Sequence, residues 1–293
     1  MVAPGGYTWC TFTTCTMKDG MSSSNNNGRG AVVAIIPLGL HWPTLDPFLF
    51  CAHHRDNYPA GNHKLGVDAD ALAGRQLGSD FVLKDGFRMY HGTEVPGFPR
   101  HPHRGFETIT LARHGLIDHS DSMGAKARFG GGDVQWMTAG QGVVHSEMFP
   151  LVNREQSNSA ELFQIWLNMP AKNKMVPAYF TMFWSDEIPE VEFEDGRGLV
   201  TSVLTIAGTL GTDPLSPPPD SWAVDPEHRV QVWRVAMQPG AEWVLPKTLK
   251  GDGRVLYVFE SGGVEVDGQD VLNNHGVQLD PTMDVSLQNG SSP

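Results

Sequence analysis

The sequence predicts an all-β protein built from two antiparallel barrels or sandwiches in tandem, and three observations carry this prediction. Segments rich in β-branched and aromatic residues are short, and each is bounded by Gly, Pro or Asp. Strand-like segments of this kind outnumber helical patterns along the chain. The 293 residues, of which 40% are apolar, are sufficient for two cores of ordinary size.

Residues 1–30 differ in composition from the remainder. They are rich in Ser, Thr, Asn and Gly, contain a single acidic residue, Asp19, and include the low-complexity run "SSSNNNGRG". We expect a disordered N-terminal tail. An acid-poor, hydroxyl-rich leader is also compatible with an organelle targeting peptide, although Arg29 is its only arginine, so that alternative stays open.

The predicted strands follow in order beyond residue 30. They are "FETITLA" (106–112), "GLIDHSDS" (115–122), "ELFQIWLNM" (161–169), "LVTSVLTIAG" (199–208), "RVQVWRVAM" (229–237), "VLYVFES" (255–261) and "GVEVDG" (263–268). Gly262 and Gly263 predict a tight hairpin within residues 260–270, because such turns need positive φ. The Pro-rich run "PLSPPPDSW" (214–222) is the strongest candidate linker.

A long segment at residues 55–97 interrupts the series of strands. Only "DADALAGRQL" within it suggests a helical turn. Because loops of this length in compact domains are usually functional or disordered, we expect this insertion to cover the mouth of a site.

Charge and cysteine content exclude several classes of function. The formal net charge of −12 repels phosphate backbones and anionic lipids, and no Lys/Arg-rich run offsets it. We therefore expect no direct nucleic-acid binding. No apolar run is long enough to span a membrane. Three cysteines without a C-x-x-C pair are expected to be free thiols of a cytoplasmic protein, or also a nuclear one in a eukaryote.

Two pairs of potential metal ligands lie 42 residues apart in the sequence. In "FPRHPHRGFETIT" (98–110), His101 and His103 are two residues apart on a predicted strand, so both side chains point to one face. In "GVVHSEMF" (142–149), His145 and Glu147 repeat this spacing. Two such strands facing each other in a barrel would bring three imidazoles and one carboxylate together, a donor set that suits a divalent metal ion.

These motifs resemble those of a known family. The run His101, His103 and Glu107, followed by "GGGDVQWMTAGQGVVHSEM" (130–148), resembles the two histidine motifs of cupin barrels, and more narrowly those of the pirins, which are bicupins. The resemblance extends through "LDPFLF", "LFQIWLN", "SDEIP" and "PPPDSW" and covers roughly residues 45–285.

The resemblance implies a ligand set and a metal. In pirins the carboxylate ligand follows the last histidine by two residues, which implies that His101, His103, His145 and Glu147 bind one iron per chain. The usual cupin carboxylate position corresponds instead to Glu107. Fe(II) is the expected metal, and Mn, Co, Ni, Cu or Zn are possible substitutes for the same ligands.

The resemblance also implies the domain organisation. We expect a metal-binding cupin at residues 31–195 and a metal-free cupin at 196–293, which contains only His228 and His275 and no H-x-H pair. Pirins continue beyond the strand at "DVSLQN" (284–289) with another strand and a helix. Either the second barrel is truncated or a divergent end replaces these elements; we expect truncation, with an unpaired strand edge near residues 271–287.

The resemblance implies two functions, and a third interpretation stays open beside them. The first is an Fe(II)-dependent dioxygenase that cleaves a flavonol such as quercetin with O2, with Glu147 as both ligand and base. The second is a non-enzymatic, iron-dependent and redox-sensing transcriptional co-regulator that binds protein partners, which an acidic surface would favour. The third is a stable bicupin whose metal is structural.

Overall fold

The computed structural model describes residues 8–16 and 30–290, with backbone only for 8–16. The chain forms two compact units. The histidine unit comprises Cys51–Asp186 together with Pro218–Ser221. The second unit comprises Met1–Phe50, Glu187–Pro217 and Trp222–Pro293.

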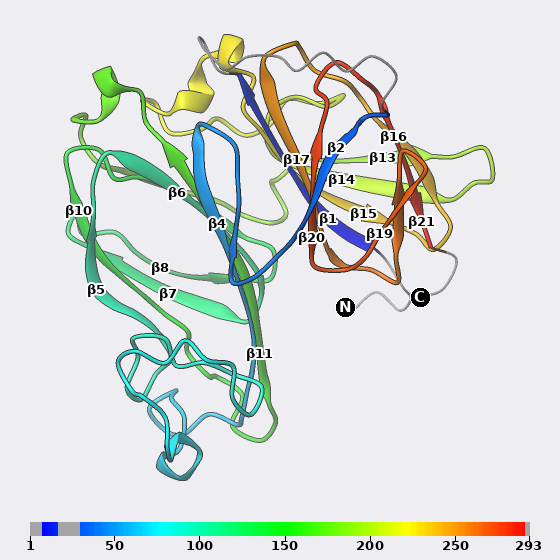
Figure 1. The fold of residues 1–293 in the computed structure, drawn as a ribbon. Coiled ribbons are helices and arrows are strands. Elements are labelled where there is room, and N and C mark those ends of the chain that lie inside the picture. The colour runs from blue at the N-terminus through cyan, green and yellow to red at the C-terminus, as the bar shows by residue number, and fades with distance from the viewer. Residues whose placement is uncertain (1–7, 17–29, 291–293) are drawn as a thin grey trace. The chain divides into compact units, whose positions relative to one another are not determined.

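The histidine unit is built from two antiparallel sheets (Figure 1). One has the strand order β5-β10-β7-β8, and the other contains β12-β9-β6-β11-β4 in that order. The bounds are β4 Phe48–Tyr58, β5 Gly97–His103, β6 Phe106–His114, β7 Leu116–Asp121, β8 Lys126–Gly130, β9 Val134–Thr138, β10 Val143–Met148, β11 Asn158–Asn168 and β12 Tyr179–Phe183, with 3-10 helices η1 Ala69–Leu72 and η2 Ala171–Asn173.

The long insertion is packed into the histidine unit. Its backbone contains the short helix η1 in "DADALAGRQL", as expected, and isolated bridges such as Asp80 with Tyr90. Val67, Phe87, Met89 and Tyr90 from this segment are buried in a core cluster. These apolar anchors explain why a segment without regular strands is ordered.

The second unit also contains two sheets, of seven and four strands (Figure 1). Their orders are β13-β14-β15-β1-β17-β20-β2 and β16-β21-β18-β19. The bounds are β1 Thr8–Thr16, β2 Val32–Pro37, β3 His41–Trp42, β13 Glu190–Glu194, β14 Val200–Ala207, β15 Gln231–Met237, β16 Glu242–Leu245, β17 Asp252–Glu260, β18 Val264–Val266, β19 Gln269–Val271, β20 His275–Leu279 and β21 Val285–Asn289, with 3-10 helices η3 Trp222–Val224 and η4 Pro226–His228.

An apolar core fills the second unit. Its members alternate with exposed residues along the strands, so that Trp243 and Leu245 of β16 and Val285 and Leu287 of β21 are buried while their neighbours face solvent. This alternation is the expected signature of a sheet that is covered on one face.

The structure corrects three expectations. Part of the predicted disordered tail, Thr8–Thr16, forms strand β1 and pairs with β15 and β17. Its Thr-rich and aromatic sequence favours a strand. Residues 1–7 and 17–29 of the predicted tail lie outside the described residues. The hairpin in 260–270 turns at Asp267–Gly268, where both residues have positive φ, and not at Gly262–Gly263.

The third correction concerns the unpaired edge expected near residues 271–287. β20 is flanked by β17 and β2, and β21 is flanked by β16 and β18, so neither is an edge. Among the described strands, the sheets of this unit end at β13, β2, β16 and β19, and β19 reaches only the first residue of the expected range, Val271.

The two units do not coincide with the predicted domains 31–195 and 196–293, because β2 pairs with β20 and β13 pairs with β14. Boundaries of independently folding domains stay a prediction. In the described part of the chain, no helix has the length and apolar character needed to cross a membrane.

Candidate metal centre

Two neighbouring antiparallel strands place the three predicted histidines together. His101 and His103 lie on β5, and His145 lies directly opposite His101 on β10. On β10 the buried positions alternate, so His145 and Glu147 face the same side as Val143. The pairing shifts register between His145 and Glu147, which places Glu147 opposite Phe98 on β5 and His119 on β7.

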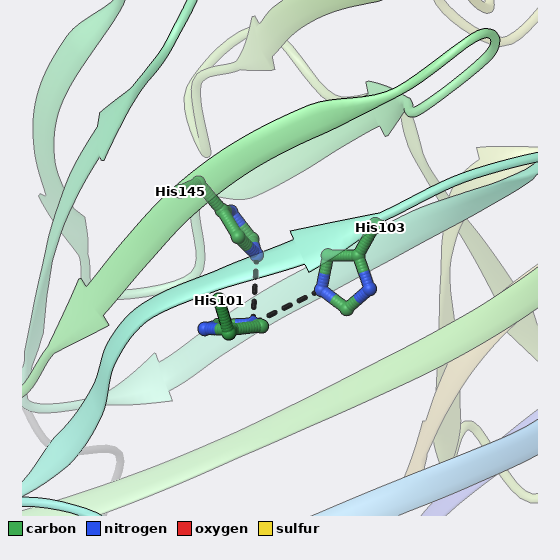
Figure 2. Close-up of side chains that lie close together, drawn as sticks. All are labelled: His101, His103 and His145. Carbon is green, nitrogen blue, oxygen red and sulfur yellow. Dashed lines mark hydrogen bonds between the residues drawn. The ribbon is translucent and has the colours of Figure 1, made fainter.

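The imidazoles converge through their Nε2 atoms, as Figure 2 shows. Nε2 of His101 lies 3.0 Å from Nε2 of His103 and 3.0 Å from Nε2 of His145. His103 and His145 are buried, with 8% and 1% of their surface exposed, whereas His101 is partly exposed. The cluster is therefore reached from solvent on the His101 side.

The protonation of the cluster leaves lone pairs for a cation. Nδ1 of His101 lies 2.8 Å from the Pro99 carbonyl, which can only accept, so in the neutral ring the proton is on Nδ1 and Nε2 has the lone pair. Burial, with further contributions from the neighbouring histidines, lowers the pKa of His103 and of His145 to about 3. Both rings are thus neutral near pH 7.

A buried carboxylate, that of Glu147, lies beside His145. Oε2 of Glu147 is 3.9 Å from Nε2 of His145 and accepts a hydrogen bond of 2.8 Å from Nε2 of Gln164. The indole N–H of Trp166 donates to Oε1 of Gln164 over 2.9 Å, which orients the amide with its NH2 toward Glu147. Oε1 of Glu147 is buried and has no hydrogen-bond partner in the structure.

This arrangement fits a divalent metal ion. Metal–nitrogen bonds of about 2.1 Å place neighbouring donors of an octahedron about 3.0 Å apart, which is the spacing of the Nε2 atoms. An unpartnered buried carboxylate oxygen is costly, and a cation at the cluster would satisfy it. Four protein donors on such an ion leave positions for other ligands.

A fourth histidine near the cluster, the buried His119 on β7, was not expected at the site. Its ring lies 5.2 Å from that of His145, and it groups with His145 and Glu147 as a possible metal-binding set. Both its nitrogens are already engaged: Gln135 Nε2 donates to Nδ1 over 2.8 Å, and Nε2 donates to Oδ2 of Asp121 over 3.1 Å. His119 therefore packs against His145, and neither of its nitrogens is free to bind a metal ion.

The competing carboxylate, Glu107, lies in a different environment. It is fully buried and accepts hydrogen bonds of 2.6 Å from the hydroxyls of Thr138 and Ser221. It belongs to neither group of possible metal ligands among the described residues. Glu147 lies beside His145 and Glu107 does not, and the choice of Glu147 as the metal ligand stays a prediction.

Aromatic side chains flank the cluster on two sides. On one side the rings of Phe106 and Trp166 stack at 4.2 Å, and both contact His103. On the other side Phe98 lies 6.2 Å from His101 and contacts Tyr90 and Phe81 of the long insertion. Aromatic rings thus lie near both His103 and His101.

Sequence comparisons identify the class of protein that this fold and site define. The family model described as Pirin matches residues 62–167. A Pseudomonas aeruginosa protein named "Putative quercetin 2,3-dioxygenase" is 32% identical over 213 residues, which cover 71% of this chain and 70% of that protein. A pirin-like protein of Caulobacter vibrioides is 39% identical over 47% of this chain and 48% of its own length.

Solved structures agree on the fold. A quercetin 2,3-dioxygenase from Acinetobacter baumannii superimposes with a TM-score of 0.66 at 23% identity, over 90% of this chain and 83% of that chain. A Geobacillus kaustophilus protein gives a TM-score of 0.56 at 18% identity, over 89% of this chain and 91% of that chain. The fold is a bicupin, and the chain belongs to the pirin family.

Proposed function

We propose that this chain is an Fe(II)-dependent dioxygenase that cleaves a flavonol-like phenol such as quercetin with O2. In this proposal His101, His103, His145 and Glu147 hold the iron. The observation that carries it is the convergence of three imidazoles, in which Nε2 of His101 lies 3.0 Å from Nε2 of both His103 and His145, beside a buried carboxylate with one unpartnered oxygen. The names of relatives as quercetin dioxygenases support the same activity.

Iron bound here would supply redox chemistry toward O2 and polarise a coordinated phenol. The protein's part is to bind and deprotonate the substrate. The carboxylate of Glu147 can accept the phenolic proton, and the hydrogen bond that Gln164 donates to Oε2 keeps the carboxylate oriented as it becomes neutral. The neutral histidines do not compete for that proton near pH 7.

The aromatic borders of the site suit a planar polyphenol. Stacking of the substrate against Phe106 and Trp166 on one side, or Phe98 on the other, would hold its rings in a fixed orientation toward the cluster. The exclusion of water by these rings would also protect the reactive anion.

Oxygen consumption by the iron-loaded protein tests the proposal. The metal content is measured first, and O2 uptake is then followed with quercetin and with quercetin methylated on its chelating hydroxyl. We expect iron-dependent uptake with quercetin and none with the methylated compound. Stoichiometric iron without quercetin-dependent uptake would show that this is not the reaction, although the iron site itself would stand.

The alternative is an iron-dependent co-regulator that acts through protein partners. The net charge of −12 supports it, because an acidic surface favours association with a basic partner. Iron-dependent affinity for such a partner without turnover of phenols would favour this function over the enzyme.

A further inference from the structure

An open groove lies in the second unit, away from the histidines. It has a volume of about 740 Å³. Its lining comes from the end of β13, from β16 and from β18 and β21, and we call it the acidic groove. The lining residues are Phe193, Glu194, Asp195, Leu210, Glu242, Trp243, Val244, Pro246, Glu265, Ser286, Leu287 and Gln288.

Two of the four strands that line the groove are edges of their sheets. β13 ends the seven-stranded sheet, and β16 ends the four-stranded sheet. No strand within the described ranges 8–16 and 30–290 pairs with the outer side of either. Such edges present free backbone donors and acceptors.

The register of β16 shows which backbone groups are free. The N–H of Asn289 donates to the carbonyl of Ala241, which marks these two residues as a hydrogen-bonded pair. Because such pairs alternate in antiparallel sheets, Trp243 is bonded to β21, whereas the N–H and C=O of Val244 point outward. The side chain of Val244 is 57% exposed.

The same reasoning applies to β13. The N–H of Asp195 donates to the carbonyl of Leu199, and that of Thr205 donates to the carbonyl of Pro189. The backbone groups of Glu192 and Glu194 therefore face the open edge. The three glutamates of β13 are exposed, a pattern that protects an edge against uncharged or acidic strands.

The chemistry of the groove selects for a particular partner. Its apolar surface centres on Phe193 and Trp243, whose rings lie 5.4 Å apart and join the core of the unit. Four carboxylates line it and no Lys or Arg does. The nearby Arg197 is paired with Asp195 and Glu242. The backbone N–H of Leu199, with those of Arg197 and Glu242 and the Arg197 side chain, lowers the pKa of Asp195 to about 2, so it stays charged.

We propose that the acidic groove binds an extended segment of a partner protein in which basic and apolar residues alternate, and that the segment adds as a strand to the free edge of β16. Side chains of an added strand alternate between the two faces of the sheet. The apolar ones would reach Phe193 and Trp243, and the basic ones would meet Glu242 on the outer face. Main-chain bonds to Val244 would fix the register.

The test uses fluorescence anisotropy with a labelled Arg-Leu-Arg-Leu-Arg peptide, blocked at both ends, and the full chain at low salt. The control peptide Glu-Leu-Glu-Leu-Glu should bind at least about tenfold more weakly, because its charges repel those of the groove. Raising the salt concentration should weaken the binding of the basic peptide.

Backbone methylation separates strand addition from simple charge attraction. One peptide is N-methylated on its three arginine amides and another on its two leucine amides. Only one set of amides can face β16, the arginine set in antiparallel addition and the leucine set in parallel addition. Loss of affinity in only one of the two peptides supports the proposal, and equal affinity of both overturns it.

The affinity of the peptide for two variants at Val244 tests whether it binds at the edge of β16. Val244→Pro removes the outward N–H at an edge position, where proline is tolerated, and should weaken binding at least about fivefold. Val244→Thr keeps that N–H and the branched shape and is the matched control. Thermal unfolding checks that both variants are folded. Three outcomes would each overturn strand addition. The first is unchanged affinity in Val244→Pro, and the second is no binding of the basic peptide to the natural chain. The third is equal affinity of both methylated peptides together with displacement of the labelled peptide by phenethylamine, an aromatic amine without a peptide backbone.

Discussion

His101 is the most exposed member of the histidine cluster and is also the one whose Nε2 lies within 3.0 Å of both other rings. If the three imidazoles hold a metal, loss of any one leaves a weak site. We predict that His101→Ala and His145→Ala each lose most of the bound iron, measured by elemental analysis after dialysis. His91→Ala, at an exposed histidine of the long insertion, is the control and should keep its iron. Full iron in both cluster variants would remove the basis of the metal assignment.

The two glutamates give a second prediction at the scale of single residues. Glu147→Gln keeps the shape but removes the charge beside the histidines, so we expect weaker iron binding and no turnover of quercetin. Glu107→Gln changes a carboxylate held by two hydroxyls outside the cluster, so we expect iron to be retained. Iron titration of both variants measures the difference. The reverse result would show that the common cupin position supplies the ligand.

A third prediction concerns pH. His103 and His145 have a pKa of about 3 in the folded protein and an ordinary value of 6.5. Between these values the unfolded chain binds more protons, so the free energy of unfolding of the metal-free protein falls as pH decreases from 6.5 toward 3. The fall is at most about 1.4 kcal/mol per pH unit for each histidine.

Urea unfolding at pH 7 and pH 4.5 measures this loss of stability. The double variant His103→Gln/His145→Gln is the comparison, because it keeps polar side chains that do not titrate. We expect a shallower dependence on pH in the variant. An equally steep dependence would mean that other groups cause the loss.

At the scale of the element, the pairing of β5 with β10 depends on a glycine. Gly97 has φ +126, and a Cβ at this position would lie 2.5 Å from the Glu147 carbonyl oxygen and 2.8 Å from Cα of Met148. We predict that Gly97→Ala costs about 1–3 kcal/mol of stability and lowers iron affinity, because it separates the strands that carry the ligands. Gly124→Ala is the control, since Gly124 has φ +94 but no atom within 4 Å of the added Cβ. Equal effects of the two substitutions on iron affinity would argue against the steric explanation.

The positions of single strands were easier to predict from the sequence than the strands with which they pair. The predicted segments at 106–112 and 199–208 correspond closely to β6 and β14, because β-branched runs bounded by turn residues report local preferences. The hairpin was placed at the wrong turn, because two adjacent turn signals compete and only the pairing of Val266 with Gln269 decides between them. β1 was missed because the composition of the whole leader hid a strand-forming segment within it.

The candidate site shows the same division. Alternation along a strand was enough to predict that His101 and His103 share one face of their strand, and that His145 and Glu147 share one face of theirs. Gln164 and His119 were not predicted, because their places beside Glu147 and His145 depend on which strands become neighbours. Each did leave a signal: Gln164 is a lone amide in the apolar run "LFQIWL", and His119 is two residues from Asp121.

At the scale of the whole molecule, strand β1 joins the start of the chain to its C-terminal half. It lies between β15 and β17, which are not paired with each other in the seven-stranded sheet. We predict that deletion of residues 1–16 exposes both edges and speeds hydrogen exchange in "VLYVFES" (255–261) more than in "DVQWMTA" (133–139). Deletion of residues 1–7 alone is the control. Unchanged exchange in "VLYVFES" after the longer deletion would show that β15 and β17 can close the sheet without β1.

The hydroxyl of Ser221 meets the buried carboxylate of Glu107 across 114 positions of the sequence. Asp220, its neighbour, offers its carbonyl to the side chain of Asn173. A gene fragment that ends at Asp186 would therefore encode the histidine strands but deprive a fully buried carboxylate of one of its donors. Production of the histidine unit by itself would therefore require the tetrapeptide Pro-Pro-Asp-Ser, either fused through a short spacer or added as a separate peptide.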